Sequence, residues 1–403
     1  MLPPLKTIKH GLHRTTEALA AELARPGTPM PAWNALEWQL ASVSAVVHGV
    51  SPLLSERCTW QASEWQHFLA TQREHVAQRH LRITAVLERI DVAARSAGMA
   101  MVPLKGSALH ALGLYVPGER PMADIDLLVR ESDAEEASQL LQKLGYVESF
   151  RQWKHRVFKP QETEPPAVLG EHRDTPINIE LHNRIQERLP VSVADISERV
   201  HPSRPHAGLN AYPSTGALMS HLLLHAAGNI CNRTFRLLHM HDIALLSARM
   251  SPEDWGSCLD EHIAGPVWWA LPPLTLVARY YQDTIPETVL DQLHAACPTI
   301  LRSISRHQTL TQVSCSDLWL HAFPGIEWSR SLSEVTHYMK NRIRPPREAI
   351  EERNDMVRTQ LWLRDQRWVT APQKRRVLTW LARPVPRMDT MYAVRAALES
   401  SAA

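Results

Sequence analysis

The sequence contains few cysteines, no long apolar run and no excess of charge of one sign. Its five cysteines (58, 231, 258, 297 and 315) are scattered and form no C-x-x-C pair. Because their number is odd and the Met-Leu-Pro-Pro-Leu-Lys start resembles no signal peptide, we expect free thiols in a reducing, cytoplasmic setting. No stretch reaches the roughly 20 apolar residues that span a bilayer, so we expect no membrane span.

The charges are nearly balanced. The chain has 44 Lys and Arg against 42 Asp and Glu, a formal net charge of +2. Proteins that coat nucleic acid carry a strong basic excess, so a nucleic-acid partner is not expected. An apolar fraction of 44% over 403 residues is ordinary for a globular protein and predicts two or three domains with a sizeable core.

An acidic pair precedes an apolar run near the end of the first third of the chain. Asp124-Ile125-Asp126 is followed at once by Leu-Leu-Val, which predicts a strand. Side chains alternate along a strand, so both aspartates share one face. Paired carboxylates are ligands that Mg²⁺ prefers. Roughly four such acid pairs are expected by chance in a chain of this composition, so the flanking sequence must support the interpretation.

The segment before the pair predicts an anion site. Residues 98–104 are typical of a strand, which ends at Lys105-Gly106-Ser107, and a helix is predicted over 108–114. A strand, a Gly-Ser turn and a helix start together direct backbone N–H groups at an anion. Glycine allows a phosphate to approach the backbone, and Ser107 can cap the helix or donate to an oxygen.

A third carboxylate is predicted after the pair. Residues 133–144 have helical periodicity and stop before Gly145, which is typical of a C-cap. Residues 176–182 alternate as a strand that places Asn178, Glu180 and His182 on one face. Glu180 is therefore a candidate partner for the aspartate pair.

These motifs resemble a known family. Leu-Lys-Gly at 104–106, Arg120 shortly before Asp-Ile-Asp-Leu-Leu-Val, and Glu-Leu-His at 180–182 are similar to the uncharacterised bacterial nucleotidyltransferase family of the DNA polymerase β superfamily. The resemblance covers residues 75–185 and extends weakly to about 250. Members of that family often lie near genes of antibiotic or modified-peptide biosynthesis.

The resemblance implies a chemistry and roles for named residues. Asp124, Asp126 and Glu180 would be the catalytic residues and would hold two Mg²⁺ ions, with Glu180 as metal ligand or as general base. The reaction implied is transfer of a nucleoside monophosphate, AMP above all, from an NTP such as ATP to a hydroxyl or phosphate of a small-molecule or peptide acceptor. The implied nucleotide-binding residues are Lys105, Gly106, Ser107, Arg120 and His182.

Two other functions remain open. One is a protein-directed, antitoxin-like enzyme that adds AMP to a tyrosine or serine of a partner, which protein labelling would reveal. The other is a catalytically inactive nucleotide-binding scaffold, which would bind without turnover. The presence of all three carboxylates weighs against the scaffold.

We expect an α+β fold with a small mixed sheet. Residues 1–97 are predicted to form a helical segment with a long helix over 62–97, residues 98–190 the catalytic core, and residues 191–403 a mostly helical C-terminal domain. A further strand is expected over 153–158. Loops are predicted over 160–173, rich in Pro and Glu, and over 189–213, a linker. Trp33, Trp38, Trp60 and Trp65 are interpreted as anchors of helix packing.

The C-terminal part holds two ambiguous motifs. His221 and His225 share a helix face, which allows half of a zinc site, but the lack of a third ligand favours core or interface histidines. Arg236, His239 and His241-Asp242 fit either a polar cluster at the substrate or a buried ion pair.

The segment 342–387 is basic, with twelve Lys or Arg against five acids and with Trp362, Trp368 and Trp380 between them. This pattern fits peptide, nucleic-acid or membrane docking as well as arginines that cover apolar helix surface. We favour the structural interpretation.

Overall fold

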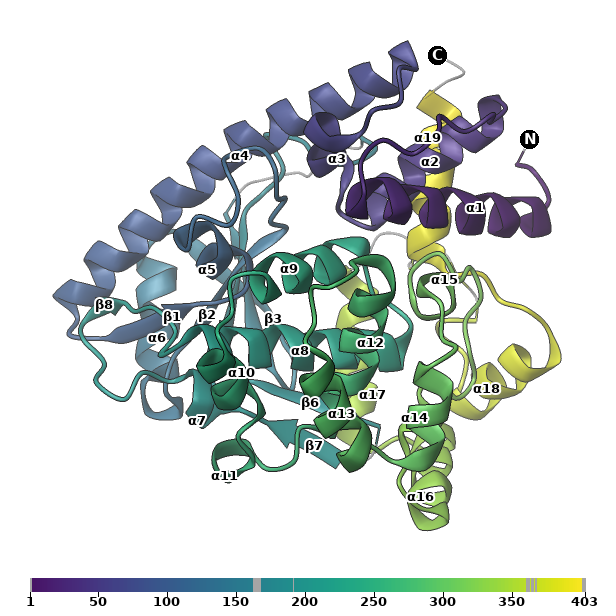
Figure 1. Ribbon diagram of the computed structural model, residues 1–403. Helices are drawn as coiled ribbons and strands as arrows, with labels where there is room; N and C mark the ends of the chain where they lie inside the picture. The colour runs from purple at the N-terminus through teal and green to yellow at the C-terminus, as the bar shows by residue number, and fades with distance from the viewer. Residues whose placement is uncertain are drawn as a thin grey trace.

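A mixed six-stranded β-sheet lies at the centre of the site-bearing part of the chain, and helices surround it (Figure 1). The computed structural model describes residues 2–161, 168–190, 192–359, 363, 366 and 368–400. The strand order is β3-β4-β5-β2-β1-β8. The strands are β1 (Ala100–Pro103), β2 (Asp124–Leu128), β3 (Tyr146–Arg151), β4 (His155–Pro160), β5 (Asn178–His182) and β8 (Gly208–Leu209). This architecture confirms the α+β class.

Two neighbouring pairs of strands are parallel, β2 with β5 and β1 with β8, and the other pairs are antiparallel. The predicted strands 98–104, 153–158 and 176–182 are confirmed as β1, β4 and β5 with shifted ends.

Other parts of the sheet region differ from the expectation. β3 was not predicted, and the segment 189–213 is no plain linker, because it contains most of a small hairpin, a helical turn and β8. The expected loop over 160–173 lies partly outside the described residues. The hairpin and the turn are β6 (Gln186–Leu189), β7 (Ser192–Asp195) and α7 (Ser197–Val200).

Of the N-terminal helices, the long α4 packs against the sheet at β1 and β8, α3 packs chiefly against α4, and α1 and α2 pack chiefly against each other (Figure 1). The buried residues of α4 include Trp65, Leu69, Val76, Ile83 and Ile90, spaced by four or seven positions. This spacing forms one apolar stripe, so burial against the sheet and its neighbours stabilises the helix. The predicted helix over 62–97 is thereby confirmed. These helices are α1 (Leu5–Ala24), α2 (Ala35–Val47), α3 (Ser51–Arg57) and α4 (Ser63–Ser96).

Four tryptophans form an aromatic cluster where α2, α3 and α4 meet. The Trp33 ring centroid lies 4.9 Å from that of Trp38 and 5.3 Å from that of Trp60. The Trp38 and Trp65 centroids are 5.8 Å apart. Trp60 and Trp65 are buried in the main core. Offset and edge-on contacts of this kind stabilise packing, which confirms the structural interpretation of these residues.

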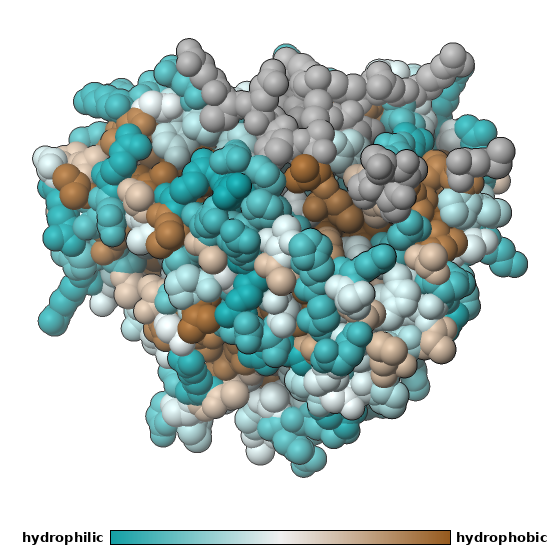
Figure 2. Space-filling model, turned by 90° about the horizontal axis from the view of Figure 1, so that it is seen from above, coloured by the Kyte–Doolittle hydropathy of each residue, from teal (hydrophilic) through white to brown (hydrophobic). Residues whose placement is uncertain are grey.

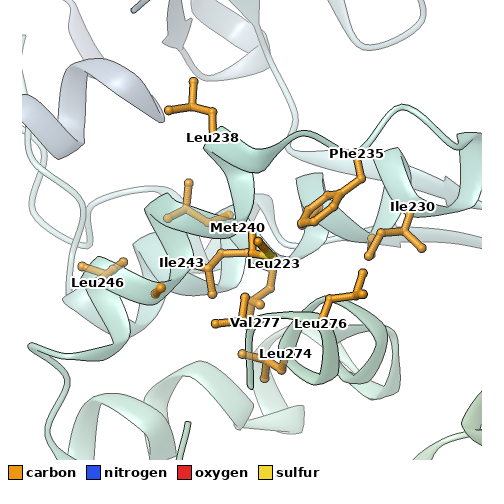
Figure 3. Packing of buried hydrophobic residues seen from close by; sticks show 14 of the residues in the cluster. Leu223, Ile230, Phe235, Leu238, Met240, Ile243, Leu246, Leu274, Leu276 and Val277 are labelled. Carbon is orange, nitrogen blue, oxygen red and sulfur yellow. The ribbon is translucent and has the colours of Figure 1, made fainter. Parts of the chain in front are cut away.

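A second body of helices contributes the largest hydrophobic core. Figure 3 shows Leu223, Met240, Leu274 and Val277 converging from three helices, with Phe235 from the turn between two of them. Burial of such side chains contributes about 1.5–3 kcal/mol each. The helices are α8 (Thr215–Asn232), α9 (Leu237–Ser247) and α12 (Leu271–Tyr280).

Short helices complete the fold. On the sheet side they are α5 (Gly106–Ala111) and α6 (Ala134–Lys143), and towards the C-terminus α10 (Pro252–Leu259), α11 (Glu261–Ala264), α13 (Glu287–Ala296), α14 (Thr299–Ser305), α15 (Leu310–Val313), α16 (Leu332–Ile343), α17 (Arg347–Thr359), α18 (Gln373–Ala382) and α19 (Met388–Ser400). Helix α19 packs against α2, and its buried residues share a hydrophobic cluster with residues of α1 and α2. α6 matches the helix predicted over 133–144.

In the basic segment 342–387, arginine side chains lie against tryptophan rings. The Arg376 guanidinium lies 5.5 Å from the Trp368 centroid and 5.2 Å from that of Trp380, and Arg342 lies 5.3 Å from the Trp380 centroid. Arginine stacked on tryptophan is stabilising in itself, so these contacts agree with the structural interpretation. Trp362 lies outside the described residues.

The molecular surface is mostly hydrophilic on the face seen in Figure 2, with separate apolar areas. Scattered apolar side chains are normal on a folded surface. Over the described ranges, no helix combines the length and the apolar character needed to cross a lipid bilayer.

Candidate active site

Three carboxylates meet where β2 and β5 run side by side. The two strands are parallel, with Asp124 opposite Asn178 and Asp126 opposite Glu180. The intervening Ile125 lies fully buried on the other face of the sheet, as alternation requires. The geometry therefore places Asp124, Asp126 and Glu180 together on a rigid platform, as the strand patterns predict.

Asp126 is the most closely contacted of the three. Lys105 Nζ lies 2.9 Å from Asp126 Oδ1, and His182 Nε2 lies 3.0 Å from the same oxygen. His182 Nε2 is also 3.6 Å from Glu180 Oε2. Asp126 and His182 are buried and Lys105 is nearly so. His182 thus bridges the carboxylates of two strands, and Lys105 supplies the nearest full positive charge.

Lys105 has an unusual backbone conformation. Its φ of 46° lies in the left-handed region, where a residue with a side chain is strained. The residue stands between the end of β1 and Gly106, the first residue of α5. Strained positions of this kind persist when the surrounding structure enforces them, and they cluster at functional sites. Here the strained turn brings the ammonium to Asp126.

The charges of the site shift one another's protonation. Burial, together with the charges of Asp126 and Glu180, raises the pKa of Asp124 to about 8. Burial also acts to raise the pKa of Asp126, but Lys105 and His182 outweigh it and hold that pKa well below its usual range. The carboxylates in turn raise the pKa of Lys105 despite its burial. Like charges held close in a buried site produce this pattern.

The carboxylates fit a hard divalent cation. The charge of the Asp124 carboxylate is opposed by the charges of Asp126 and Glu180, and the charges of Lys105 and His182 offset this only in part. Mg²⁺ takes oxygen ligands and commonly one or two carboxylates. A cation bound by these oxygens would remove the repulsion that raises the pKa of Asp124. The donor set of Asp124, Asp126 and Glu180 therefore suits Mg²⁺.

Gly106 and Ser107 begin α5 next to this platform. A Cβ on Gly106 would lie 2.4 Å from Arg120 Nη1 and 2.8 Å from Met122 Cγ, so packing requires glycine there. The Ser107 hydroxyl is buried 4.0 Å from Met122 Sδ. The helix spans 106–111, earlier than the predicted 108–114. Roles of Gly106 and Ser107 in nucleotide binding remain predictions.

Arg120 forms a buried ion pair with Asp242 of α9. Its Nε donates to Asp242 Oδ1 at 2.8 Å and its Nη2 to Oδ2 at 2.7 Å. The Tyr115 hydroxyl donates to Oδ1 at 2.7 Å. Of the two roles open to Asp242, the structure favours the buried ion pair. Arg120 thereby ties the loop before β2 to the helical body, while phosphate binding by Arg120 remains a prediction.

A pocket adjoins the carboxylates on the side of α8. Lys105, Glu180 and His182 contribute to its wall together with side chains that the sequence did not single out for this site. The further lining residues are Lys154, His155, Arg184, Ile185, Gln186, Glu187, His221, Leu224 and His225. The pocket wall carries basic side chains, which can bind a phosphorylated substrate, and carboxylates, which can bind a cation.

His221 and His225 line this pocket. The Tyr212 hydroxyl lies 2.7 Å from His221 Nδ1 and 3.4 Å from the Lys105 backbone N–H, which links α8 to the strained turn. His225 Nδ1 is 3.9 Å from Glu187 Oε1. Within the described ranges, neither histidine belongs to a group of three metal ligands. Both histidines are polar residues in the pocket wall, where α8 meets neighbouring elements. This agrees with the interpretation as core or interface histidines, which the sequence favoured over half of a zinc site.

His155 is a site residue that sequence reasoning missed. It lies on β4 directly opposite His182 of β5. The strand over 153–158 was predicted, but its register against β5 was not. The histidine in the predicted strand 153–158 was the signal in the sequence that could have pointed to this residue, had the pairing of that strand with β5 been known.

A family comparison is consistent with this site. The family model of an uncharacterised nucleotidyltransferase matches residues 34–283, which include β2, β5 and the pocket wall from α8. No curated protein and no solved structure gives a significant match to the chain.

Proposed function

Because the chain belongs to the uncharacterised nucleotidyltransferase family, we propose that it transfers a nucleoside monophosphate from an NTP to an acceptor in a Mg²⁺-dependent reaction. Membership supports nucleotidyl transfer in general. The observation that carries the specific proposal is the alignment of Asp126 with Glu180 on parallel strands, with Asp124 on the same face.

Asp124, Asp126 and Glu180 would hold the cation. Bound there, Mg²⁺ would neutralise charge on the nucleotide phosphates as pyrophosphate leaves. Burial acts to raise the pKa of Glu180, but the nearby imidazole of His182 and the charges of His155 and Lys105 outweigh burial and lower that pKa below its usual value. A carboxylate with a lowered pKa is a poor proton acceptor, so Glu180 is better suited as a cation ligand than as general base.

Basic side chains around the pocket would receive the phosphates. Lys105 lies at the carboxylates, and Lys154 and Arg184 lie on the pocket wall. A Lys105 ammonium paired with Asp126 can turn to a phosphate oxygen when a cation takes over the carboxylate. His182, between Asp126 and Glu180, keeps both carboxylates oriented. Binding and orientation are then the main contributions of these residues to the reaction.

ATP is the nucleotide we propose first, and a small molecule or peptide with a hydroxyl or phosphate is the proposed acceptor. The choice of acceptor, including an antibiotic-like product, depends on the family resemblance. Labelling from α-³²P NTPs in fractionated cell extract tests it, with wild type, Asp126→Asn and the exposed control Glu136→Gln. Label in the small-molecule or peptide fraction, lost only in Asp126→Asn, supports the proposal. Label in protein favours the protein-directed enzyme, and nucleotide binding without any transfer favours the scaffold.

A further inference from the structure

Two histidines lie against the carboxylate that β5 brings to the site. His155 and His182 are opposite each other on β4 and β5, with ring centroids 4.8 Å apart. His155 Nε2 is 3.5 Å from Glu180 Oε1, and His182 Nε2 is 3.6 Å from Glu180 Oε2. One candidate ligand atom from each of the three residues lies within 4.8 Å of the others. The two nitrogens and the carboxylate thus surround one small volume.

The separations suit a first-row transition-metal ion. Bonds of about 2.0–2.2 Å from such an ion to nitrogen and oxygen place tetrahedral ligands roughly 3.3–3.6 Å apart. The two nitrogen–oxygen distances at Glu180 fall in this range. Two histidines and one carboxylate are also a recurrent ligand set for zinc. Each histidine thus already lies at a metal-ligand separation from one of the two Glu180 oxygens.

The hydrogen bonding of His155 points to a ligand. Its side chain is 10% exposed, and neither ring nitrogen has a hydrogen-bond partner among the described residues. Buried polar groups in native proteins are nearly always satisfied, so an unsatisfied imidazole calls for a partner. His182 Nε2 is shared, because it also lies 3.0 Å from Asp126 Oδ1. An ion at this nitrogen would replace that hydrogen bond.

We propose that His155, Glu180 and His182 bind a divalent transition-metal ion, separate from the oxygen-only position at Asp124 and Asp126 and sharing Glu180 with it. Imidazole nitrogen selects first-row transition metals over Mg²⁺. The inference rests on the proposed function only through that shared carboxylate. It implies that one of the two cation positions beside the substrate discriminates between metals.

Pulsed EPR of nucleotide-free protein loaded with Mn²⁺, without a polyhistidine tag, tests the proposal. Wild type should show ¹⁴N couplings from directly bound imidazole. His155→Gln should reduce them and weaken Mn²⁺ binding at this position about 10-fold or more. His155→Gln/His182→Gln should abolish them. His225→Gln, which removes a histidine from the same pocket, should leave them unchanged. Circular dichroism confirms that each variant is folded.

Oxygen-only coordination in wild type, or couplings that persist in the double variant, overturns the proposal. Its failure is distinct from failure of the proposed function. If Mn²⁺ is bound by oxygen ligands only and the protein still transfers nucleotides, the histidine site is rejected and the proposed function stands. Nitrogen-bound Mn²⁺ without any nucleotide binding rejects the transfer function and keeps the site.

Discussion

Lys105 Nζ and Asp126 Oδ1 lie 2.9 Å apart at the end of a strained turn. In the described part of the chain, no other lysine ammonium lies within 4.0 Å of the carboxylates of Asp124, Asp126 and Glu180. The pair lies where a cation would bind by the account given above. Lys105 therefore acts as an internal counter-ion for Asp126 in the cation-free protein. The remaining carboxylates are left with excess negative charge, which several substitutions can test.

Replacing Asp124 should stabilise the cation-free protein while removing its function. The raised pKa of Asp124 shows that its charge is unfavourable in the fold. Asp124→Asn removes that unfavourable charge and should raise the free energy of unfolding near pH 7 by more than about 1.4 kcal/mol, the worth of one pKa unit. Denaturant unfolding without Mg²⁺ measures the gain, with Glu136→Gln as control. A destabilised Asp124→Asn protein would contradict the crowded-carboxylate account.

Removing the counter-ion should make the fold dependent on Mg²⁺. Lys105→Met leaves Asp126 buried without its cation, a loss of about 3 kcal/mol. Added Mg²⁺ should restore part of this stability, because a cation can replace the ammonium. Lys154→Met, which removes the partner of Glu187 in the same pocket, should gain no more from Mg²⁺ than wild type. Equal Mg²⁺ effects in both variants would argue against a cation at Asp126.

The Arg120–Asp242 pair should behave as one structural unit. Arg120→Met or Asp242→Leu alone leaves an uncompensated buried charge and should cost about 3–5 kcal/mol. The double variant should lose less than the sum of the two single losses, by a coupling energy of about 1–3 kcal/mol in a double-mutant cycle. Additive losses would mean that Arg120 serves another partner, such as the nucleotide phosphates.

Gly106 should tolerate no side chain. In Gly106→Ala the new methyl would collide with Arg120 and Met122, and overpacking of this kind costs about 1–3 kcal/mol. Gly256 of α10 provides the matched control, because a Cβ there meets no atom within 4 Å. Gly256→Ala should stabilise the protein by about 0.5–1 kcal/mol through helix propensity. Thermal unfolding of both variants distinguishes the two effects.

Stability should fall in mild acid because of His48. Burial lowers its pKa to about 3, and it is held by the Leu237 N–H at Nδ1 (3.0 Å) and Ser316 Oγ at Nε2 (2.8 Å). The unfolded histidine binds a proton below about pH 6.5 and the folded one does not, so its contribution to stability shrinks as the pH falls from 6.5 towards 3.

Between pH 7.5 and pH 5, wild type should therefore lose about 2 kcal/mol relative to His48→Gln, at about 1.4 kcal/mol per pH unit. Unfolding free energies at the two pH values measure the difference, and replacement of the exposed His10 by Gln serves as control. Equal losses in wild type and His48→Gln would show that His48 takes up its proton without unfolding.

Much of the site could be predicted because it depends on local periodicity. Alternation along each strand is enough to place Asp124 and Asp126 on one face of β2 and Glu180 and His182 on one face of β5, and the parallel pairing of the two strands brings these side chains onto the same face of the sheet. The apolar stripe of α4 likewise follows from its spacing. These features need no knowledge of how distant segments meet.

Features that depend on long-range register could not be predicted. The position of His155 opposite His182 requires the order of β4 and β5. The pairing of Arg120 with Asp242 joins residues 122 positions apart, and either could have been placed at the substrate instead. The hairpin β6–β7 consists of two four-residue strands rich in polar residues, so tertiary contacts define it. β3 contains Tyr146, Val147 and Phe150, residue types that favour strands, so its sequence held a local signal.

The most direct test of a Mg²⁺–nucleotide site at Asp124, Asp126 and Glu180 is a thermal-shift series. ATP, GTP, CTP and UTP are compared with and without Mg²⁺, on wild type and on Asp124→Asn/Asp126→Asn. A nucleotide at 100 times its Kd should stabilise wild type by about 2.7 kcal/mol. The account predicts a shift for at least one nucleotide that requires Mg²⁺ and disappears in the double variant. A shift that persists in that folded variant, or no shift with any nucleotide, would contradict it.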